Sequence, residues 1–239
     1  MTTPSPPIAP PAYEDLAGLV EYSLTRPELS EEEVSRGCDA AKNYRVAAVV
    51  IRPSDVDLAA RWVASSGVRL AAQVDVPHGH STTAAKLYAA RDLIRRGVQD
   101  IDTVMNTGKL VSRQLQYLET ELLQMAEACH QSGATLQISL ESEYLTEELK
   151  IIAARVARRA GADYIGTNLL EDVALLRTHS RERLKIASRA PIPDLETALS
   201  FRDAGCTRIQ LAAPEAILDA WKAKLVQPAP SPQPLAPSL

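Results

Sequence analysis

The sequence contains little cysteine, no long apolar run and no block of positive charge. Its three cysteines, Cys38, Cys129 and Cys206, are widely and irregularly spaced, so they form neither a disulfide framework nor a paired-cysteine metal motif. We interpret them as buried thiols of a reducing compartment. No stretch approaches 18 uncharged apolar residues, and the first residues lack the charged and apolar regions of a signal peptide. We therefore expect a soluble, cytoplasmic protein with no membrane partner.

The charge balance narrows the range of partners. The formal net charge is −4, and lysine and arginine alternate with acidic residues instead of clustering. Such a surface gives no electrostatic basis for binding nucleic acid. We expect a small molecule as the ligand and consider a homodimer as a candidate assembly.

The two ends of the chain differ in composition from the middle. Residues 1–12 contain five prolines, and residues 226–239 consist mainly of proline, serine and alanine without charge. Neither segment can build a periodic apolar face. We predict a flexible Pro-rich tail at each end and one domain over residues 13–225.

The middle of the chain alternates β-rich runs with amphipathic helical stretches. Such alternation favours βα units around a parallel sheet. Several helical stretches end at a glycine, and residues 30–33 (SEEE) match a capping box. Eight units in one domain predict an α/β fold of a single (β/α)8 TIM barrel, with its site at the carboxyl ends of the strands. The β-rich runs are residues 19–22, 46–52, 70–76, 100–106, 135–141, 164–168, 183–188 and 208–213.

Three segments carry a resemblance to a known family. They are GHSTTAAKLYAARDLIRRGVQDIDTVMNTGKL (79–110), LQISLESEYLTEEL (136–149) and ARRAGADYIGTN (157–168). All three resemble motifs of the deoxyribose-phosphate aldolase family. The resemblance implies a class I aldolase barrel without a cofactor, which cleaves 2-deoxy-D-ribose 5-phosphate through a lysine Schiff base.

The lysines that the resemblance implies are absent from their expected positions. The Schiff-base lysine falls on Gly166, and the second lysine aligns without gaps to Ala187. Class I chemistry needs an amine whose pKa is lowered, and neither residue supplies one. Lys185 precedes Ala187 by two residues on the same strand face, about 6.6 Å deeper in the barrel. A two-residue loop insertion would make Lys185 the surrogate amine.

Two acidic residues of the family pattern are retained. The resemblance places the acid of the aldolase proton relay on Asp102, which shares a strand face with Asn106. Burying a carboxylate inside a parallel strand costs free energy unless the group is paired or takes part in function. A structural role for Asp102 therefore needs a nearby hydrogen-bond donor. Glu141, at the end of its strand, also matches the family. We predict Asp102, Glu141 and Lys185 as the candidate catalytic residues.

The loops that would hold the substrate phosphate have changed. The resemblance implies glycine-rich loops after strands seven and eight, but residues 188–194 read SRAPIPD, in which Pro191 and Pro193 lack N–H donors. The loop after strand six is also shorter than in the family. The predicted ligand-binding residues are Glu21, Asn106, Thr167, Asn168 and Ser188.

A cluster at the end of the third strand offers a weak metal motif. Asp75, His78 and His80 supply one carboxylate and two imidazoles in QVDVPHGHS. Histidines spaced in this way more often make ordinary hydrogen bonds, so we predict no metal site. If a metal is bound, Asp75, His78 and His80 are the candidate ligands.

Three functional hypotheses remain open from sequence. The first is a pseudoenzyme that has lost Schiff-base chemistry and binds a ligand or scaffolds an assembly. The second is a repurposed barrel enzyme that uses carboxylate or metal acid–base chemistry on a small carbonyl or hydroxy compound. The third is an active deoxyribose-phosphate aldolase that uses Lys185.

Overall fold

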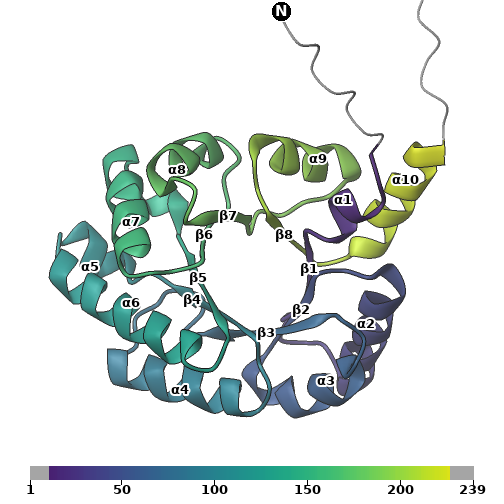
Figure 1. The fold of residues 1–239 in the computed structure, drawn as a ribbon, viewed down its shortest axis with the longest axis horizontal. Helices are drawn as coiled ribbons and strands as arrows, with labels where there is room; N and C mark the ends of the chain where they lie inside the picture. The colour runs from purple at the N-terminus through teal and green to yellow at the C-terminus, as the bar shows by residue number, and fades with distance from the viewer. Residues whose placement is uncertain (1–10, 227–239) are drawn as a thin grey trace, which may run out of the picture.

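Eight parallel strands form one closed barrel in the computed structural model, which describes residues 11–226 (Figure 1). Each strand pairs with the next along the chain, and β8 pairs with β1 to close the ring. The predicted single (β/α)8 barrel is confirmed, and each β-rich run overlaps one strand. The strands are β1 (Val20–Leu24), β2 (Ala48–Ile51), β3 (Arg69–Val74), β4 (Asp100–Val104), β5 (Thr135–Ser139), β6 (Tyr164–Thr167), β7 (Lys185–Ser188) and β8 (Arg208–Leu211).

Helices surround the barrel and cover the outer face of every strand (Figure 1). Within the described residues, none of them is long and apolar enough to cross a membrane. The α-helices are α1 (Glu14–Ala17), α2 (Glu31–Tyr44), α3 (Val56–Val63), α4 (Thr83–Arg95), α5 (Thr107–Val111), α6 (Leu115–His130), α7 (Glu147–Arg159), α8 (Asp172–Ser180), α9 (Leu195–Ala204) and α10 (Pro214–Val226); short 3-10 helices η1 (Pro53–Asp55) and η2 (Ser142–Tyr144) lie in loops.

The helix ends follow the signals in the sequence. Ser30 and Glu33 form the predicted capping box at the start of α2, in which each side chain satisfies a backbone N–H of the other. Gly97, Gly133 and Gly161 follow α4, α6 and α7 with φ of +100°, +72° and +85°. These left-handed conformations are the ones that glycine adopts without strain.

The apolar core is a shell between the strands and the helices. In β4, Ile101 belongs to this core, whereas Asp100 and Asp102 alternate with it and face the inside of the barrel. In β5, Leu136 and Ile138 pack outward in the same way. The lumen is therefore lined by the other half of each strand, and in several strands that half is polar. All three cysteines are buried and free, as predicted.

The two ends of the described chain meet beside the seam between β1 and β8. The indole Nε1 of Trp221 in α10 donates a hydrogen bond to the carbonyl oxygen of Tyr13, 3.2 Å away. The predicted tails, residues 1–12 and 226–239, lie outside the described residues except at their inner edges.

Candidate active site

The lumen of the barrel holds two layers of charged side chains. The lower layer lies at the amino ends of the strands, where Asp100 accepts two hydrogen bonds of 2.7 Å from Arg69. Arg208 donates to Asp100 at 3.0 Å, pairs with Glu21 at 3.1 Å and lies 3.8 Å from the ring centroid of Tyr164. Burial raises the pKa of Glu21, while the charge of Arg208 opposes that rise. The predicted binding residue Glu21 is thus part of a closed ion-pair network.

The upper layer joins Asp102, Ser139 and Arg189, from β4, β5 and the end of β7. Ser139 Oγ donates to Asp102 Oδ1 at 2.8 Å, and Arg189 Nη1 donates to Ser139 Oγ at 2.9 Å. The same Nη1 pairs with Asp102 Oδ2. Burial lowers the pKa of Arg189 to about 10, opposed by the charge of Glu21, so the guanidinium remains a cation at neutral pH. Asp102 therefore has the donor that a structural role requires.

Arg189 lies directly over Gly166. A Cβ atom added to Gly166 would stand 3.0 Å from Ser139 Oγ and 3.3 Å from Arg189 Cδ. Gly166 pairs in register with Ala187, and Arg189 follows Ala187 by two residues on the same face. The arginine side chain thus fills the space above the position where the resemblance expects the Schiff-base lysine. The sequence prediction missed Arg189, although this alternation provided a signal for it.

Lys185 lies at the other end of the barrel. It is the first residue of β7, its side chain is exposed, and its Nζ stands 5.5 Å from the ring centroid of Tyr164, the first residue of β6. Ala187 is fully buried and brings no functional group. The expectation that Lys185 reaches the reacting end of the barrel is not met, because β7 keeps its register without a loop insertion.

Three predicted binding residues have structural roles. Asn106 begins α5 and accepts a hydrogen bond from the backbone N–H of Lys109 at 3.0 Å. Thr167 is fully buried and donates to Asp172 Oδ2 at 3.2 Å. Ser188 is also fully buried and follows lumen-facing Ala187, so it points outward from the barrel. These three residues shape the loops around the site, and none of them lines the cavity described below.

The predicted binding residue Asn168 stands at the rim after β6. Its Nδ2 donates to Glu143 Oε2 at 2.8 Å. Among the described residues, its buried Oδ1 has no hydrogen-bond partner. Asn168 thus keeps one acceptor unused.

Glu141 makes polar contacts with the loop after β3 and with the start of α5. Its Oε1 lies 2.5 Å from His78 Nδ1, and its Oε2 accepts from Thr107 Oγ1 at 2.9 Å. The rings of His78 and His80 stack with centroids 5.3 Å apart. The carboxylate therefore fixes one nitrogen of a half-exposed imidazole at the carboxyl end of the barrel.

The three candidate metal ligands do not assemble. Asp75 turns into its own loop, where Oδ2 accepts from the Ser81 N–H at 2.8 Å and Oδ1 from Ser81 Oγ at 2.7 Å. Across residues 11–226, no group of three histidine, cysteine or acidic side chains is arranged to hold a metal ion. The Asp75, His78 and His80 motif is therefore not a ligand set in this structure.

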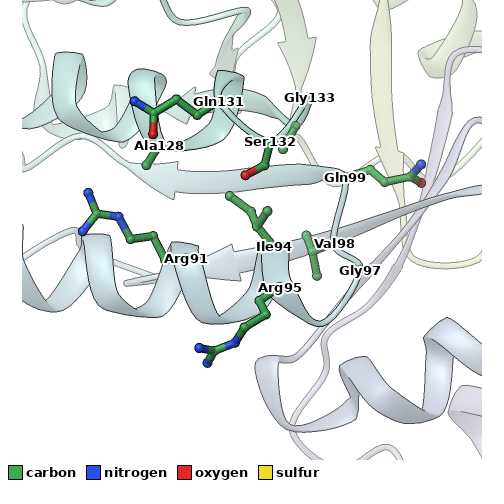
Figure 2. Close-up of a pocket in the computed structure, with 11 residues that line it drawn as sticks. Arg91, Ile94, Arg95, Gly97, Val98, Gln99, Ala128, Gln131, Ser132 and Gly133 are labelled. Atoms are coloured by element: carbon green, nitrogen blue, oxygen red, sulfur yellow. The ribbon is translucent and has the colours of Figure 1, made fainter.

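A cavity of about 670 Å³ opens at the carboxyl ends of β1, β7 and β8. Arg189 is part of its wall, and its lining contains no lysine among the described residues. The lining residues are Ser23, Arg189, Ala190, Pro191, Ile192, Pro193, Gln210, Ala212, Ala213, Ala216 and Ile217. A second cavity, of about 650 Å³, lies between the ends of α4 and α6, and none of the predicted site residues lines it (Figure 2).

The helices that follow β7 and β8 begin with acidic residues. Asp194 caps α9 by accepting from the Thr197 N–H at 2.8 Å. At the start of α10, Glu215 accepts from the hydroxyl of Tyr22 at 2.8 Å. Free N–H groups and the helix dipole attract an anion to a helix N-terminus. At α9 the Asp194 carboxylate already accepts from one of these N–H groups, and at α10 Glu215 places a carboxylate in the first turn.

Curated relatives match nearly the whole chain. The deoxyribose-phosphate aldolase of Bacteroides thetaiotaomicron is 32% identical over 223 residues, which cover 90% of this chain and 94% of that protein. The deoxyribose-phosphate aldolase of Treponema denticola is 29% identical over 85% of this chain and 98% of that protein. No protein-family model matches the sequence.

Solved structures agree in fold. A protein described as QR15, an aldolase, superposes with a TM-score of 0.83 at 27% identity over 88% of this chain and 97% of that one. The Aeropyrum pernix deoxyribose phosphate aldolase, described as tetrameric, has a TM-score of 0.82 at 21% identity over 89% and 93%. With its sequence relatives and its sequential eight-stranded barrel, the chain belongs to the deoxyribose-phosphate aldolase family.

Proposed function

We propose that this chain is a ligand-binding member of the family that does not form a Schiff base. One observation carries the proposal: the Arg189 guanidinium pairs with Asp102 in the space directly above Gly166. In a class I aldolase, the nucleophile must be an amine that can lose its proton near neutral pH. A guanidinium cannot do so, and it also holds the acid that the resemblance assigns to proton transfer.

The surroundings of the cavity support the same proposal. Pro191 and Pro193 contribute no N–H donor, and α9 begins at the carboxylate of Asp194. Family members hold a sugar phosphate at loops of this kind through backbone amides. A substrate held without that grip loses the positioning that accounts for roughly 7 to 11 kcal/mol of a barrier.

Borohydride trapping tests the proposal. The protein is incubated with 2-deoxyribose 5-phosphate or with acetaldehyde, reduced, and weighed intact, with the Bacteroides thetaiotaomicron relative as the positive control. We expect no stoichiometric adduct on this chain and an adduct on the control. A stoichiometric adduct that maps to Lys185 would contradict the proposal and support the third hypothesis.

A second candidate function rests on the contact between His78 and Glu141. A carboxylate bound to one ring nitrogen orients the imidazole and leaves the other nitrogen to exchange a proton, as in general acid–base catalysis. This arrangement favours the hypothesis of a repurposed enzyme acting on a small carbonyl compound. Deuterium incorporation into dihydroxyacetone in heavy water, followed by NMR, tests it: exchange must fall at least tenfold in His78→Asn, and the absence of exchange in the parent protein would reject it.

We propose a cytoplasmic location and a homodimer, which size-exclusion chromatography with light scattering would test. The third hypothesis, catalysis by Lys185, gains no support from the exposed position of that residue at the amino end of β7.

A further inference from the structure

We infer that the cavity at the carboxyl ends of β1, β7 and β8 binds a small carboxylic acid with an apolar body, held by the guanidinium of Arg189. The inference rests on the proposed ligand-binding function and names the chemical class of the ligand. Three features carry it: the unused donors of Arg189, the apolar walls of the cavity, and the scarcity of groups that could hold a dianion.

The free edge of Arg189 is suited to a carboxylate. Its Nη1 is used by Asp102 and Ser139, whereas no described residue accepts from Nε or Nη2. These two nitrogens form the edge of the guanidinium that binds a carboxylate through two parallel hydrogen bonds. The chain already uses this edge elsewhere, because Arg69 holds Asp100 through Nε and Nη2 at 2.7 Å each. In Arg189 the corresponding edge has no protein partner within the described chain.

The rest of the wall is apolar. Among the described lining residues, Ser23 and Gln210 are the polar ones besides Arg189, and the others are alanine, proline and isoleucine. A volume of about 670 Å³ is in the range of sites for small organic molecules. Burying hydrocarbon against such walls lowers the free energy of the complex. The same walls offer few hydrogen-bond partners to the hydroxyl groups of a sugar.

The local charge favours a monoanion over a phosphate dianion. The carboxylate of Asp102 already pairs with the Arg189 guanidinium. Glu21 adds a second acidic group whose charge raises the pKa of Arg189. The carboxylate of Asp194 stands at the start of α9, the helix after the proline-bearing loop. Neither Pro191 nor Pro193 can donate a hydrogen bond. One guanidinium edge matches one carboxylate, and the described lining of the cavity contains no second cationic side chain.

Isothermal titration calorimetry with hexanoate, hexan-1-ol and 2-deoxyribose 5-phosphate tests the ligand class. We expect saturable binding of hexanoate at least tenfold tighter than that of either other probe, because two charge-assisted hydrogen bonds and the apolar chain act together. Equal binding of hexan-1-ol would overturn the role of Arg189. Tighter binding of the sugar phosphate, or no binding of hexanoate, would overturn the inference.

Matched variants on α10 locate the site without disturbing the ion pair between Arg189 and Asp102. Ala216→Trp fills the cavity from the exposed face of α10, whereas Ala220→Trp puts the same side chain on the same helix outside the lining. Hexanoate affinity should fall at least tenfold in the first variant and stay unchanged in the second; equal effects would reject the site. Arg189→Lys should also weaken hexanoate at least tenfold, because lysine has no bidentate edge.

The outcome separates this inference from the proposed function. Failure of hexanoate to bind, with no borohydride adduct, would remove the carboxylate assignment and leave the loss of Schiff-base chemistry standing. A borohydride adduct would remove the proposed function whatever hexanoate does.

Discussion

At the scale of single residues, the contact between Gly166 and Arg189 limits what can be restored. A lysine at position 166 would have to displace the arginine, because a Cβ atom there already stands 3.3 Å from Arg189 Cδ. Asp102 would then exchange one buried cationic partner for another. The lysine would gain no grip on a sugar phosphate from this exchange.

We therefore expect Gly166→Lys, alone or combined with Ala187→Lys, to leave turnover of 2-deoxyribose 5-phosphate orders of magnitude below that of a family aldolase. The reason is that positioning, worth roughly 7 to 11 kcal/mol, is still missing. A coupled assay for acetaldehyde release checks this, with circular dichroism to confirm folding. Turnover close to that of the Bacteroides thetaiotaomicron relative would show that the proline-bearing loop still binds phosphate.

The cysteines give a second prediction at this scale. Burial raises the pKa of Cys38 to about 11 and that of Cys206 to about 12. Burial, and then the charge of Asp163, raises the pKa of Cys129 to about 12. At pH 8 the thiolate fraction is at most on the order of one in a thousand.

We expect none of the three thiols to react with Ellman's reagent within an hour at pH 8, and all three to react in guanidinium chloride. Absorbance at the thionitrobenzoate band counts the reacted groups. Prompt reaction of Cys38 in the native protein would mean that helix α2 opens from the barrel.

The sequence predicted individual site residues unevenly. Alternation along a strand was enough to place Asp102 in the lumen. It did not show that Arg189 is its partner, because that contact joins strands far apart in the chain. A position at a strand end predicts Thr167 and Ser188 as site residues, but both alternate with the lumen-facing pair Gly166 and Ala187 and so face outward.

At the scale of secondary structure elements, the loop from β3 to α4 depends on Gly79. This glycine has φ of +66°, and a Cβ atom there would stand 2.3 Å from the backbone oxygen of Val104. Gly133, after α6, has a similar φ of +72° but no atom within 4 Å of its Cβ position. Gly79 is therefore required both by its backbone conformation and by the lack of space for a Cβ atom, whereas Gly133 is required by its backbone conformation alone.

We predict that Gly79→Ala lowers the free energy of unfolding by about 2 to 5 kcal/mol, and Gly133→Ala by about 1 to 2 kcal/mol. A left-handed backbone costs an alanine about 1 to 2 kcal/mol, and the clash with Val104 adds about 1 to 3 kcal/mol. Urea unfolding followed by fluorescence measures both. Equal losses would show that the loop relaxes away from β4.

Secondary structure was predicted well because its signals are local. The capping box at Ser30 and the glycines after α4 and α6 are visible in a few adjacent residues. The short helix α5 was not predicted, since its five residues are too few to show a periodic face. The acidic start of α9 was visible in the sequence, but its effect on the cavity depends on how the loop folds back.

At the scale of the whole molecule, the burial of Glu21 in the lumen makes the free energy of unfolding depend on pH. Burial raises its pKa above the ordinary value of 4.5, while Arg208 opposes the rise. A raised carboxyl pKa means that the folded state binds the proton more tightly than the unfolded state. The stabilisation is complete below 4.5 and is lost as the pH rises through the folded pKa.

We predict that Glu21→Gln removes this dependence. The stability of the parent protein relative to the variant should decline as the pH rises above 4.5, by at most about 1.4 kcal/mol per pH unit. Urea unfolding of both proteins at four pH values measures the difference. A difference that grows with pH in favour of the parent protein would mean that Arg208 outweighs burial and lowers the pKa.

The seam between β1 and β8 has a kinetic consequence. All other strand pairs join neighbours in the chain, whereas this one joins the two ends of the barrel, so its closure costs the most chain entropy. The cavity lies across this seam, with Ser23 from β1 and Gln210 from β8 in its wall. An occupant that contacts both strands would bind only when the β1–β8 pairing is formed. It would slow unfolding while leaving the rate of folding nearly unchanged.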